Sequence, residues 1–470
     1  MSASAERARG VRRARPVAVL DVGKTRVRVC AVGWEGELLA QSERDNCVLA
    51  GPPYPHADVE GLFDWFCDAL RELAARHPIE ALVPVTHGAT AALIGARGLE
   101  LPVLDYEFAD LPALELPSGT FAQTGSPALP AGLNLARQLA WQEAAFPEAF
   151  SRVECILPYP QYWAWRFSGK RVSEITSLGC HTHLWAPQAC SFSALAVERG
   201  WERLFPPRVE AWTSLGPLLP EVAQRAGLDP ACCVHAGIHD SNASYLVQRV
   251  VRGDEPFAVV STGTWVVCMA RGVPLGCLRA ELDMLANVDA FGEPVACMRF
   301  QGGREYAALA GQAGQALTAD ERDLQGVIAS GALALPSYSD QGGPFASRRG
   351  EVTPPAPQQP RARAALASLY CALMIDLCLD CLGARGEVVL EGRMAANPAI
   401  AAVLGALRAP QRCLASDDPT GTLRGAALLA RWSARGSIAA TVSPVAPLPL
   451  AGLADYRARW RARVEDPSIG

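Results

Sequence analysis

The stretch Val17-Ala-Val-Leu-Asp-Val-Gly-Lys-Thr-Arg-Val-Arg-Val-Cys-Ala-Val32 decides the fold of this chain. Its first four residues are apolar, as in a buried strand, and its last seven alternate between polar and apolar side chains. A polar turn, Asp21 to Thr25, lies between them. The stretch therefore predicts two strands joined by a tight loop, and Glu37 to Gln41 predicts a third strand.

The same pattern recurs near the middle of the chain. Phe257-Ala-Val-Val260 is followed by Ser261-Thr-Gly-Thr264 and then by Trp265-Val-Val-Cys-Met-Ala270. The two loops lie about half a chain length apart, which is typical of an internal duplication. We expect an α/β protein in which two similar domains face each other across a cleft.

The length of 470 residues supports two domains, because a single hydrophobic core stops growing near roughly 300 residues. We predict a first domain over 17–230 and a second over 231–470. Residues 1–16 contain five arginines and predict a disordered arm. The final amphipathic helix, around Tyr456 to Trp460, is expected to pack across the domain interface or on the first domain.

Composition excludes several classes of protein. The formal net charge of −5 gives no reason to expect nucleic acid as a partner. No apolar segment follows the arginine-rich arm, so we expect no signal peptide. The apolar stretch Ala364 to Leu382 is interrupted by Asp376 and Asp380, which favours a buried helix over a membrane span. Fifteen cysteines without a disulfide pattern indicate reduced thiols and a cytoplasmic protein.

The two loops have the chemistry of phosphate sites. A tight turn between strands offers backbone N–H groups and threonine hydroxyls, and Gly23 and Gly263 allow phosphate to approach the backbone. Lys24 is one of two lysines beside 41 arginines, which suggests a compact point charge. Asp21 ends a strand beside this anionic site, where a carboxylate suits Mg²⁺. Alone, each loop is equally typical of a plain hairpin.

A third motif, Ala236-Gly-Ile-His-Asp240-Ser-Asn-Ala243, lies between a predicted strand and a predicted helix. Asp240 is either a plain helix N-cap or a general base that accepts a hydroxyl proton during phosphoryl transfer. His235 and His239 are four residues apart, but no third ligand accompanies them, so zinc is not favoured.

These motifs, in this order, resemble those of the FGGY carbohydrate kinases. The likeness rests on Asp21-Val-Gly-Lys-Thr25, Gly237-Ile-His-Asp240, Ser261-Thr-Gly-Thr-Trp265, Leu390-Glu-Gly-Arg-Met-Ala-Ala-Asn-Pro398 and Gly425-Ala-Ala-Leu-Leu-Ala430. It spans nearly the whole chain. The first loop and the segment Val103 to Phe108 are most similar to the L-rhamnulokinase and L-fuculokinase branch.

The resemblance implies two ribonuclease H-like domains of the actin-like ATPase superfamily, with ATP and a sugar meeting in the interdomain cleft. It implies phosphorylation of a ketose hydroxyl that depends on ATP and Mg²⁺. The implied roles are a catalytic base, a metal-side carboxylate, phosphate loops and an adenosine loop. The implied catalytic base is Asp240, and the implied metal-side carboxylate is Asp21. The implied phosphate loops contain Gly23, Lys24, Thr25, Thr262, Gly263 and Thr264. The implied adenosine loop contains Gly392, Arg393 and Asn397.

The sugar side is predicted from segments that follow apolar strands. Thr86-His-Gly-Ala89 places His87 and Gly88 at a strand end, where His87 is either a sugar ligand or a structural residue. Asp105, Tyr106 and Glu107 form either a hydroxyl-binding loop or an exposed loop. His239 and Asp240 complete the predicted substrate site. Trp163 favours core packing over sugar stacking.

Two departures from the family pattern bear on specificity. Glu391-Gly392-Arg393 carries one glycine where the family usually has two or three, and Arg393 can instead stack on adenine or reach a phosphate. Tyr106 stands where the family more often has an acid. A sugar-independent ATPase and a catalytically silent sugar sensor stay open as alternatives. The identity of the sugar and the oligomeric state, a homodimer included, stay open too.

Overall fold

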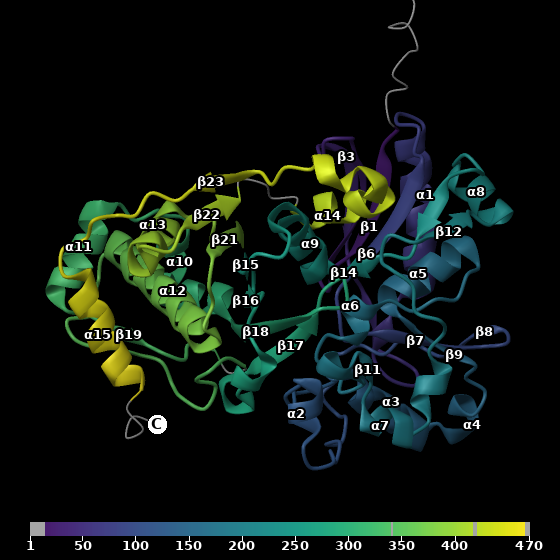
Figure 1. Ribbon diagram of the computed structural model, residues 1–470, viewed down its shortest axis with the longest axis horizontal. Helices are drawn as coiled ribbons and strands as arrows, with labels where there is room; N and C mark the ends of the chain where they lie inside the picture. Colours follow the sequence, from purple (N-terminus) through teal and green to yellow (C-terminus); the bar gives the residue numbers. More distant parts are fainter. Residues whose placement is uncertain (1–14, 340–341, 417–420, 466–470) are drawn as a thin grey trace, which may run out of the picture.

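Two large sheets form the centres of two α/β lobes in the computed structural model, which describes residues 15–339, 342–416 and 421–465 (Figure 1). Residues 1–14 of the predicted arm lie outside the described residues. The first sheet has the order β12 (Ser214–Pro217), β13 (Cys233–His235), β6 (Ala81–Thr86), β1 (Val17–Val22), β2 (Arg26–Val32), β3 (Leu38–Asp45), and β14 (Ile238–His239) also pairs with β6.

The second sheet repeats the pairing pattern of the first. In the first sheet, β2 pairs antiparallel with both β3 and β1, and β6 pairs in parallel with both β1 and β13. The last pair, β13 with β12, is antiparallel. The same succession runs along the second sheet, which adds β17 at its edge. Its strands are β17 (Met284–Val288), β18 (Pro294–Phe300), β16 (Val266–Ala270), β15 (Phe257–Thr262), β21 (Glu387–Gly392), β22 (Cys413–Ser416) and β23 (Val442–Pro444). The duplication expected from the two loops is confirmed.

The first sheet extends past the boundary predicted at residue 230. Strands β13 and β14 lie beyond it, yet both pair in parallel with β6. This sheet therefore ends at His239 rather than before residue 231. The short strands after Leu228 carry no signal of which sheet they join, because that depends on a distant partner strand.

One face of the first sheet is covered by α1 (Val59–Ala74), α5 (Tyr159–Ser168) and α8 (Pro220–Ala226). Helix α1 starts where the Asp58 carboxylate accepts the Gly61 N–H at 3.0 Å, which satisfies one of the free donors of the first turn. Phe66 of α1 and Trp163 of α5 are fully buried under the sheet, their rings 4.9 Å apart. Trp163 is thus a core residue, as predicted.

The opposite face of the first sheet is covered by α9 (Asp240–Arg252) and α14 (Gly421–Ala430). Val19 and Val83 of the sheet share a buried cluster with Leu246 of α9 and Leu423 of α14. Figure 1 shows α14, drawn in yellow, beside β1 and away from the second lobe. The late part of the chain therefore completes the core of the first lobe.

Helix α12 (Pro360–Leu382) is the central helix of the second lobe. It is the one helix in the described part of the chain that is long and apolar enough to span a membrane, and 89% of its most apolar window is buried in the protein. It packs against α10 (Gly302–Gln315), α11 (Glu321–Ser330) and α13 (Pro398–Arg408). The predicted buried helix is confirmed.

The C-terminal helix α15 (Leu453–Val464) belongs to the second lobe. Arg457 and Arg461 of α15 each lie 2.7 Å from the fully buried carboxylate of Asp376 in α12. Trp460 is fully buried and donates its indole N–H to the Ala334 carbonyl at 2.7 Å. The expectation that this helix crosses to the first domain is wrong, because its arginines meet a buried acid in α12.

Helix α9 joins the two lobes. Ala243 and Leu246 pack on the first sheet, whereas the ring of Tyr245 stacks on Phe257 of the second sheet at 5.2 Å. Its first residue is Asp240. The chain therefore places this aspartate where the two lobes meet.

All fifteen cysteines are free thiols.

The remaining helices and strands are short. The elements are β4 (Val48–Leu49), β5 (His56–Ala57), β7 (Ala91–Gly95), β8 (Gly98–Leu101), β9 (Cys155–Pro158), β10 (Trp185–Ala186), β11 (Ser191–Phe192), β19 (Ala334–Leu335), β20 (Glu351–Val352), α2 (Thr120–Thr124), α3 (Leu135–Ala145), α4 (Pro147–Phe150), α6 (Ile175–Leu178) and α7 (Ala194–Glu198).

Candidate functional site

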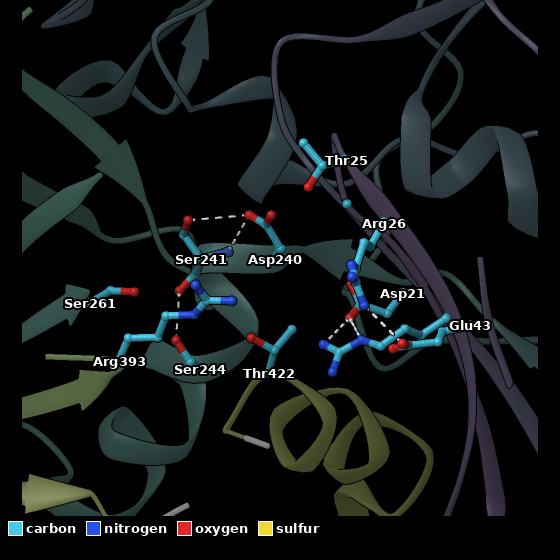
Figure 2. A pocket seen from close by; sticks show the side chains of 12 residues that line it. Asp21, Thr25, Arg26, Glu43, Asp240, Ser241, Ser244, Ser261, Arg393 and Thr422 are labelled. Atoms are coloured by element: carbon cyan, nitrogen blue, oxygen red, sulfur yellow. Dashed lines mark hydrogen bonds and ion pairs between the residues drawn. The ribbon is translucent and has the colours of Figure 1, made fainter. Parts of the chain in front are cut away.

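A polar cavity of about 660 Å³ lies between the lobes. Figure 2 shows Asp240 in its middle, with Asp21 on one side and Ser261 and Arg393 on the other. The lining residues come from both hairpins, from α9 and α14, and from the end of β21: Asp21, Gly23, Thr25, Arg26, Arg28, Glu43, Asp240, Ser241, Ser244, Ser261, Arg393 and Thr422. The first loop, the second strand–loop junction and Asp240 therefore share one space.

Asp21 is a buried acid with one cationic partner. Residues 21 and 28 face each other across the hairpin, and the Arg28 guanidinium donates to Asp21 Oδ2 from Nε at 3.0 Å and from Nη2 at 2.5 Å. Burial raises the pKa of Asp21, and the charge of Arg28 opposes that rise. Both bonds go to Oδ2, so Oδ1 is the oxygen that can bind a further cation.

Asp240 occupies the first turn of α9, but it is not the N-cap. The N-cap is His239, and the Asp240 carboxylate accepts from the backbone N–H of Ser241 at 2.6 Å and from its hydroxyl at 3.2 Å. Both bonds use Oδ1. The side chain of Asp240 is one-third exposed, so it can meet a ligand in the cavity.

A chain of buried hydrogen bonds holds the turn before Asp240. The His239 backbone N–H donates to the Thr176 hydroxyl oxygen at 3.0 Å, and that hydroxyl donates to Glu174 Oε2 at 2.6 Å. Glu174 is fully buried, and burial raises its pKa to about 8, so this carboxyl is mostly protonated at neutral pH. The position of Asp240 is thus fixed from the interior of the first lobe.

A second cavity, of about 930 Å³, adjoins the first through Thr25 and Arg393, which line both. Gly263 and Thr264 of the second loop line this space, together with Asn397 at the start of α13. Asn397 caps α13 by accepting the Ala399 N–H at 3.1 Å. Gly263, Thr264, Arg393 and Asn397, predicted for the second phosphate loop and the adenosine loop, therefore line one cavity next to that of Asp240.

Thr262 of the predicted phosphate loop and Gly392 of the predicted adenosine loop connect two strands instead of lining a cavity. The buried Thr262 hydroxyl donates to the Glu391 carbonyl at 2.5 Å and accepts the Met394 N–H at 2.9 Å. A Cβ on Gly392 would lie 2.1 Å from the Thr262 carbonyl oxygen, and φ is +85° there, so only glycine fits. Both residues join β15 to the loop after β21 and line neither cavity.

Of the predicted sugar-side residues, His239 and Gly88 lie near Asp240, whereas His87, Asp105 and Tyr106 line a small separate cavity with Lys24. His239 Nε2 lies 3.2 Å from Asp240 Oδ1, and a Cβ on Gly88 would lie 2.9 Å from the same nitrogen. The His87 ring is 5.2 Å from that of Tyr106. Burial lowers the pKa of both histidines, which favours neutral imidazoles here.

Lys24 does not line the main cavity, and its predicted contact with phosphate stays a prediction. Its ammonium is bonded to the Asp105 carboxylate, lies 3.5 Å from Glu107 Oε2 and sits 4.9 Å from the centre of the Tyr106 ring. In a tight turn, successive side chains point in different directions, so its neighbours Gly23 and Thr25 line the cavity while Lys24 reaches the sugar-side loop.

The Asp21 carboxylate fits a magnesium ion that arrives with phosphates. In the described ranges of the chain, no three acidic, histidine or cysteine side chains converge on a possible metal position. Mg²⁺ in nucleotide sites usually takes one or two protein carboxylates and completes its shell with water and phosphate oxygens. Asp21, which lies on this cavity, matches the single-carboxylate case of that donor set.

Several cavity residues were missed from the sequence. Arg28 could have been found, because a hairpin closing at Val22 and Val27 sets it opposite Asp21. Ser241 and Ser244, one helical turn apart on α9, follow Asp240 too closely to be separated from ordinary helix residues. Thr422 comes from α14, whose docking on the first lobe no local pattern reveals.

The chain is similar to known proteins over most of its length. Residues 254–438 match the family model described as the carbohydrate kinase FGGY C-terminal domain. The crystal structure of a carbohydrate kinase from Novosphingobium aromaticivorans is 35% identical, with a TM-score of 0.85, over 95% of this chain and 100% of that one. This chain belongs to the FGGY carbohydrate kinase family.

More distant FGGY relatives agree on the fold. The structure of xylulose kinase from Rhodospirillum rubrum aligns at 19% identity with a TM-score of 0.75, over 96% of this chain and 98% of that one. The fold is thus the two-domain, actin-like ATPase fold that the sequence predicts. L-fuculokinase from Salmonella typhi is 26% identical over 54% of this chain, and the match spans 56% of that relative's length.

Proposed function

We propose that this FGGY protein is an ATP-dependent sugar kinase that phosphorylates a hydroxyl of a ketose of the L-fuculose or L-rhamnulose type. The observation that carries the proposal is the position of Asp240. Its carboxylate lies in a cavity that contains Gly23, Thr25 and Ser261, beside the sugar-side residue His239. The likeness to L-fuculokinase suggests the class of ketose.

In the proposed reaction, Asp240 acts as a general base. The sugar hydroxyl oxygen attacks the γ-phosphorus of ATP, the bond from this phosphorus to the β–γ bridging oxygen breaks, and ADP leaves. The hydroxyl proton passes to Asp240 Oδ2, because Ser241 already donates two hydrogen bonds to Oδ1. Those two bonds also orient the carboxylate.

The two loops position the phosphates. The N–H groups of Gly23 and Gly263 close the two turns, so these glycines are proposed to let phosphate approach the backbone. The hydroxyls of Thr25 and Thr264 are proposed to contact the phosphate oxygens, with Arg393 between the two cavities adding positive charge. Mg²⁺, proposed to bind at Asp21, supplies neutralisation of the charge on the phosphate oxygens. Arg393 and Asn397, which line the second cavity, are proposed to border adenosine, and Gly392 is proposed to shape the turn that carries Arg393.

The test is phosphorylation of a ketose panel by the wild type and by Asp240→Asn. We expect the variant to lose about 10²- to 10⁴-fold in kcat, because asparagine keeps the shape of the side chain but accepts no proton. MgATP affinity, measured by calorimetry, should change little. Asp455→Asn, an exposed aspartate on α15, is the matched control and should keep full activity.

The other outcomes separate the alternatives. ADP release by the wild type without any sugar would favour a sugar-independent ATPase, and sugar binding without turnover would favour a silent sensor. An Asp240→Asn variant that loses nucleotide affinity and turnover in equal measure would contradict the base assignment. L-fuculose, L-rhamnulose, L-xylulose, D-ribulose and D-xylulose form the panel.

A further inference from the structure

Lys24 links two loops with different proposed tasks. Its neighbours Gly23 and Thr25 line the cavity beside Asp240, whereas its own side chain leaves the phosphate loop and bonds to Asp105 on the sugar-side loop. Asp105 follows β8 by only a few residues, and its backbone N–H donates to the Pro55 carbonyl at 3.0 Å. The ion pair therefore spans two separately anchored segments.

The pair is well shielded from solvent. The side chains of Lys24 and Asp105 are 19% and 12% exposed, and the ammonium also lies against the Tyr106 ring. An ion pair with this little exposure is screened less by water and salt than a surface pair. It can therefore hold the two loops in one relative position.

Hydrogen bonds hold the first loop, from Gly23 to Arg26, so that a displacement of one of its residues moves the others. The Gly23 N–H donates to the Arg26 carbonyl at 3.0 Å, which closes the turn. Asn46 also stabilises the turn. Its side-chain amide donates to the Gly23 carbonyl at 2.8 Å, and its backbone N–H donates to the Thr25 carbonyl at 2.9 Å. A shift of Lys24 must therefore move Gly23 and Thr25 as well.

The sugar-side loop is similarly connected to the reacting centre. Tyr106 packs edge-on against His87, and the neighbouring Gly88 lies so near His239, which precedes Asp240, that an added Cβ would be 2.9 Å from its Nε2. Two carboxylates, Asp105 and Glu107, share the single ammonium of Lys24. This excess of negative charge suits hydroxyl donors of a neutral polyhydroxy substrate and disfavours a sugar acid.

We propose that the Lys24–Asp105 pair couples sugar binding to nucleotide binding. A neutral sugar that hydrogen-bonds to the loop from Asp105 to Glu107 fixes this loop, the ion pair fixes Lys24, and Gly23 and Thr25 are held ready for the phosphates. Lys24 is in this view a positioning residue rather than a catalytic one. The inference rests on the proposed function, and linkage requires that nucleotide strengthen sugar binding by the same factor.

The experiment measures the dissociation constant of Mg²⁺ with a non-hydrolysable ATP analogue by calorimetry, with and without the ketose that the wild type phosphorylates. We expect the ketose to tighten analogue binding about tenfold in the wild type. Lys24→Met and Asp105→Asn should each reduce that factor to about twofold or less, and the double variant should lose no more than either single one. Lys170→Met, at the chain's other lysine, is exposed and should keep the wild-type factor.

The inference is overturned if Lys24→Met keeps the wild-type factor, if the losses of the two single variants multiply in the double variant, or if the wild type shows no coupling. Thermal unfolding of each variant checks folding, and Lys24→Gln replaces the methionine variant if that one unfolds. A wild type that phosphorylates no sugar contradicts the proposed function instead. The two failures are therefore distinguishable.

Discussion

The two hairpin loops share a backbone plan but not a charge pattern. In the first, Val22 pairs with Val27 and the Gly23 N–H bonds to the Arg26 carbonyl; in the second, Thr262 pairs with Val266 and the Gly263 N–H bonds to the Trp265 carbonyl. The second loop is one residue shorter. Asp21 and Ser261 occupy the same place, two residues before the loop glycine.

The difference lies in what each loop adds to that plan. Asp21 is buried beside Arg28, whereas Ser261 faces Val267 across its hairpin and carries no charge. The first hairpin therefore brings a paired acid and arginine to the cavity, and the second hairpin brings an uncharged serine. Duplication preserved the backbone geometry of the two loops and let their side-chain chemistry diverge.

Replacing Asp21 with serine, the residue at the equivalent position of the second hairpin, should have the largest effect on turnover. We expect Asp21→Ser to lower kcat about 10²- to 10³-fold, because the proposed magnesium-side carboxylate is lost and Arg28 is left without its partner. Initial rates over a range of Mg²⁺ concentrations measure it. Unimpaired turnover would contradict the proposed role of Asp21.

The two loop glycines should differ in their tolerance of a methyl group. A Cβ on Gly23 would lie 2.8 Å from the Arg26 carbonyl oxygen, whereas one on Gly263 would meet no atom closer than 3.9 Å. We expect Gly23→Ala to cost about 2 kcal/mol of stability and Gly263→Ala to stay within about 1 kcal/mol of the wild type. Unfolding transitions of the pair give the comparison, and equal midpoints would show that the first turn yields easily.

The smallest effect is expected when Thr262 of the second hairpin is replaced by valine, the residue at the equivalent position, Val22, of the first hairpin. Thr262→Val keeps the shape of the side chain but leaves the Met394 N–H without its acceptor, at a cost of about 1.5 kcal/mol. Because Met394 borders the second cavity, nucleotide affinity should fall as well. Calorimetry with an ATP analogue tests this, and unchanged affinity would mean that the loop after β21 holds its position without Thr262.

Much of this architecture could be predicted from local patterns. Strand alternation and the two glycine turns sufficed for both hairpins, and polar residues between an apolar strand and a helix located Asp240. These features depend on neighbours in sequence. The direction of Lys24 was missed because side-chain direction inside a tight turn follows no period, and Asp105 lies 81 residues away from it.

Other features depend on packing between distant segments. The apolar run before the Asp240 motif indicates a strand at β13, but not that β13 and β14 pair with β6. The apolar character of α14 requires a buried position without saying which lobe buries it. Glu174 reads as an ordinary surface acid, and only the interior around it reveals its bond to Thr176.

Helix α14 has a consequence for how the protein is made. The face of the first sheet that carries Val19 and Val83 is buried in part by Leu423, near the end of the chain. During translation, the amino-terminal lobe emerges from the ribosome long before this cover does. Its valine-rich strands are then open to chaperones, and the lobe matures only after α14 has been synthesised.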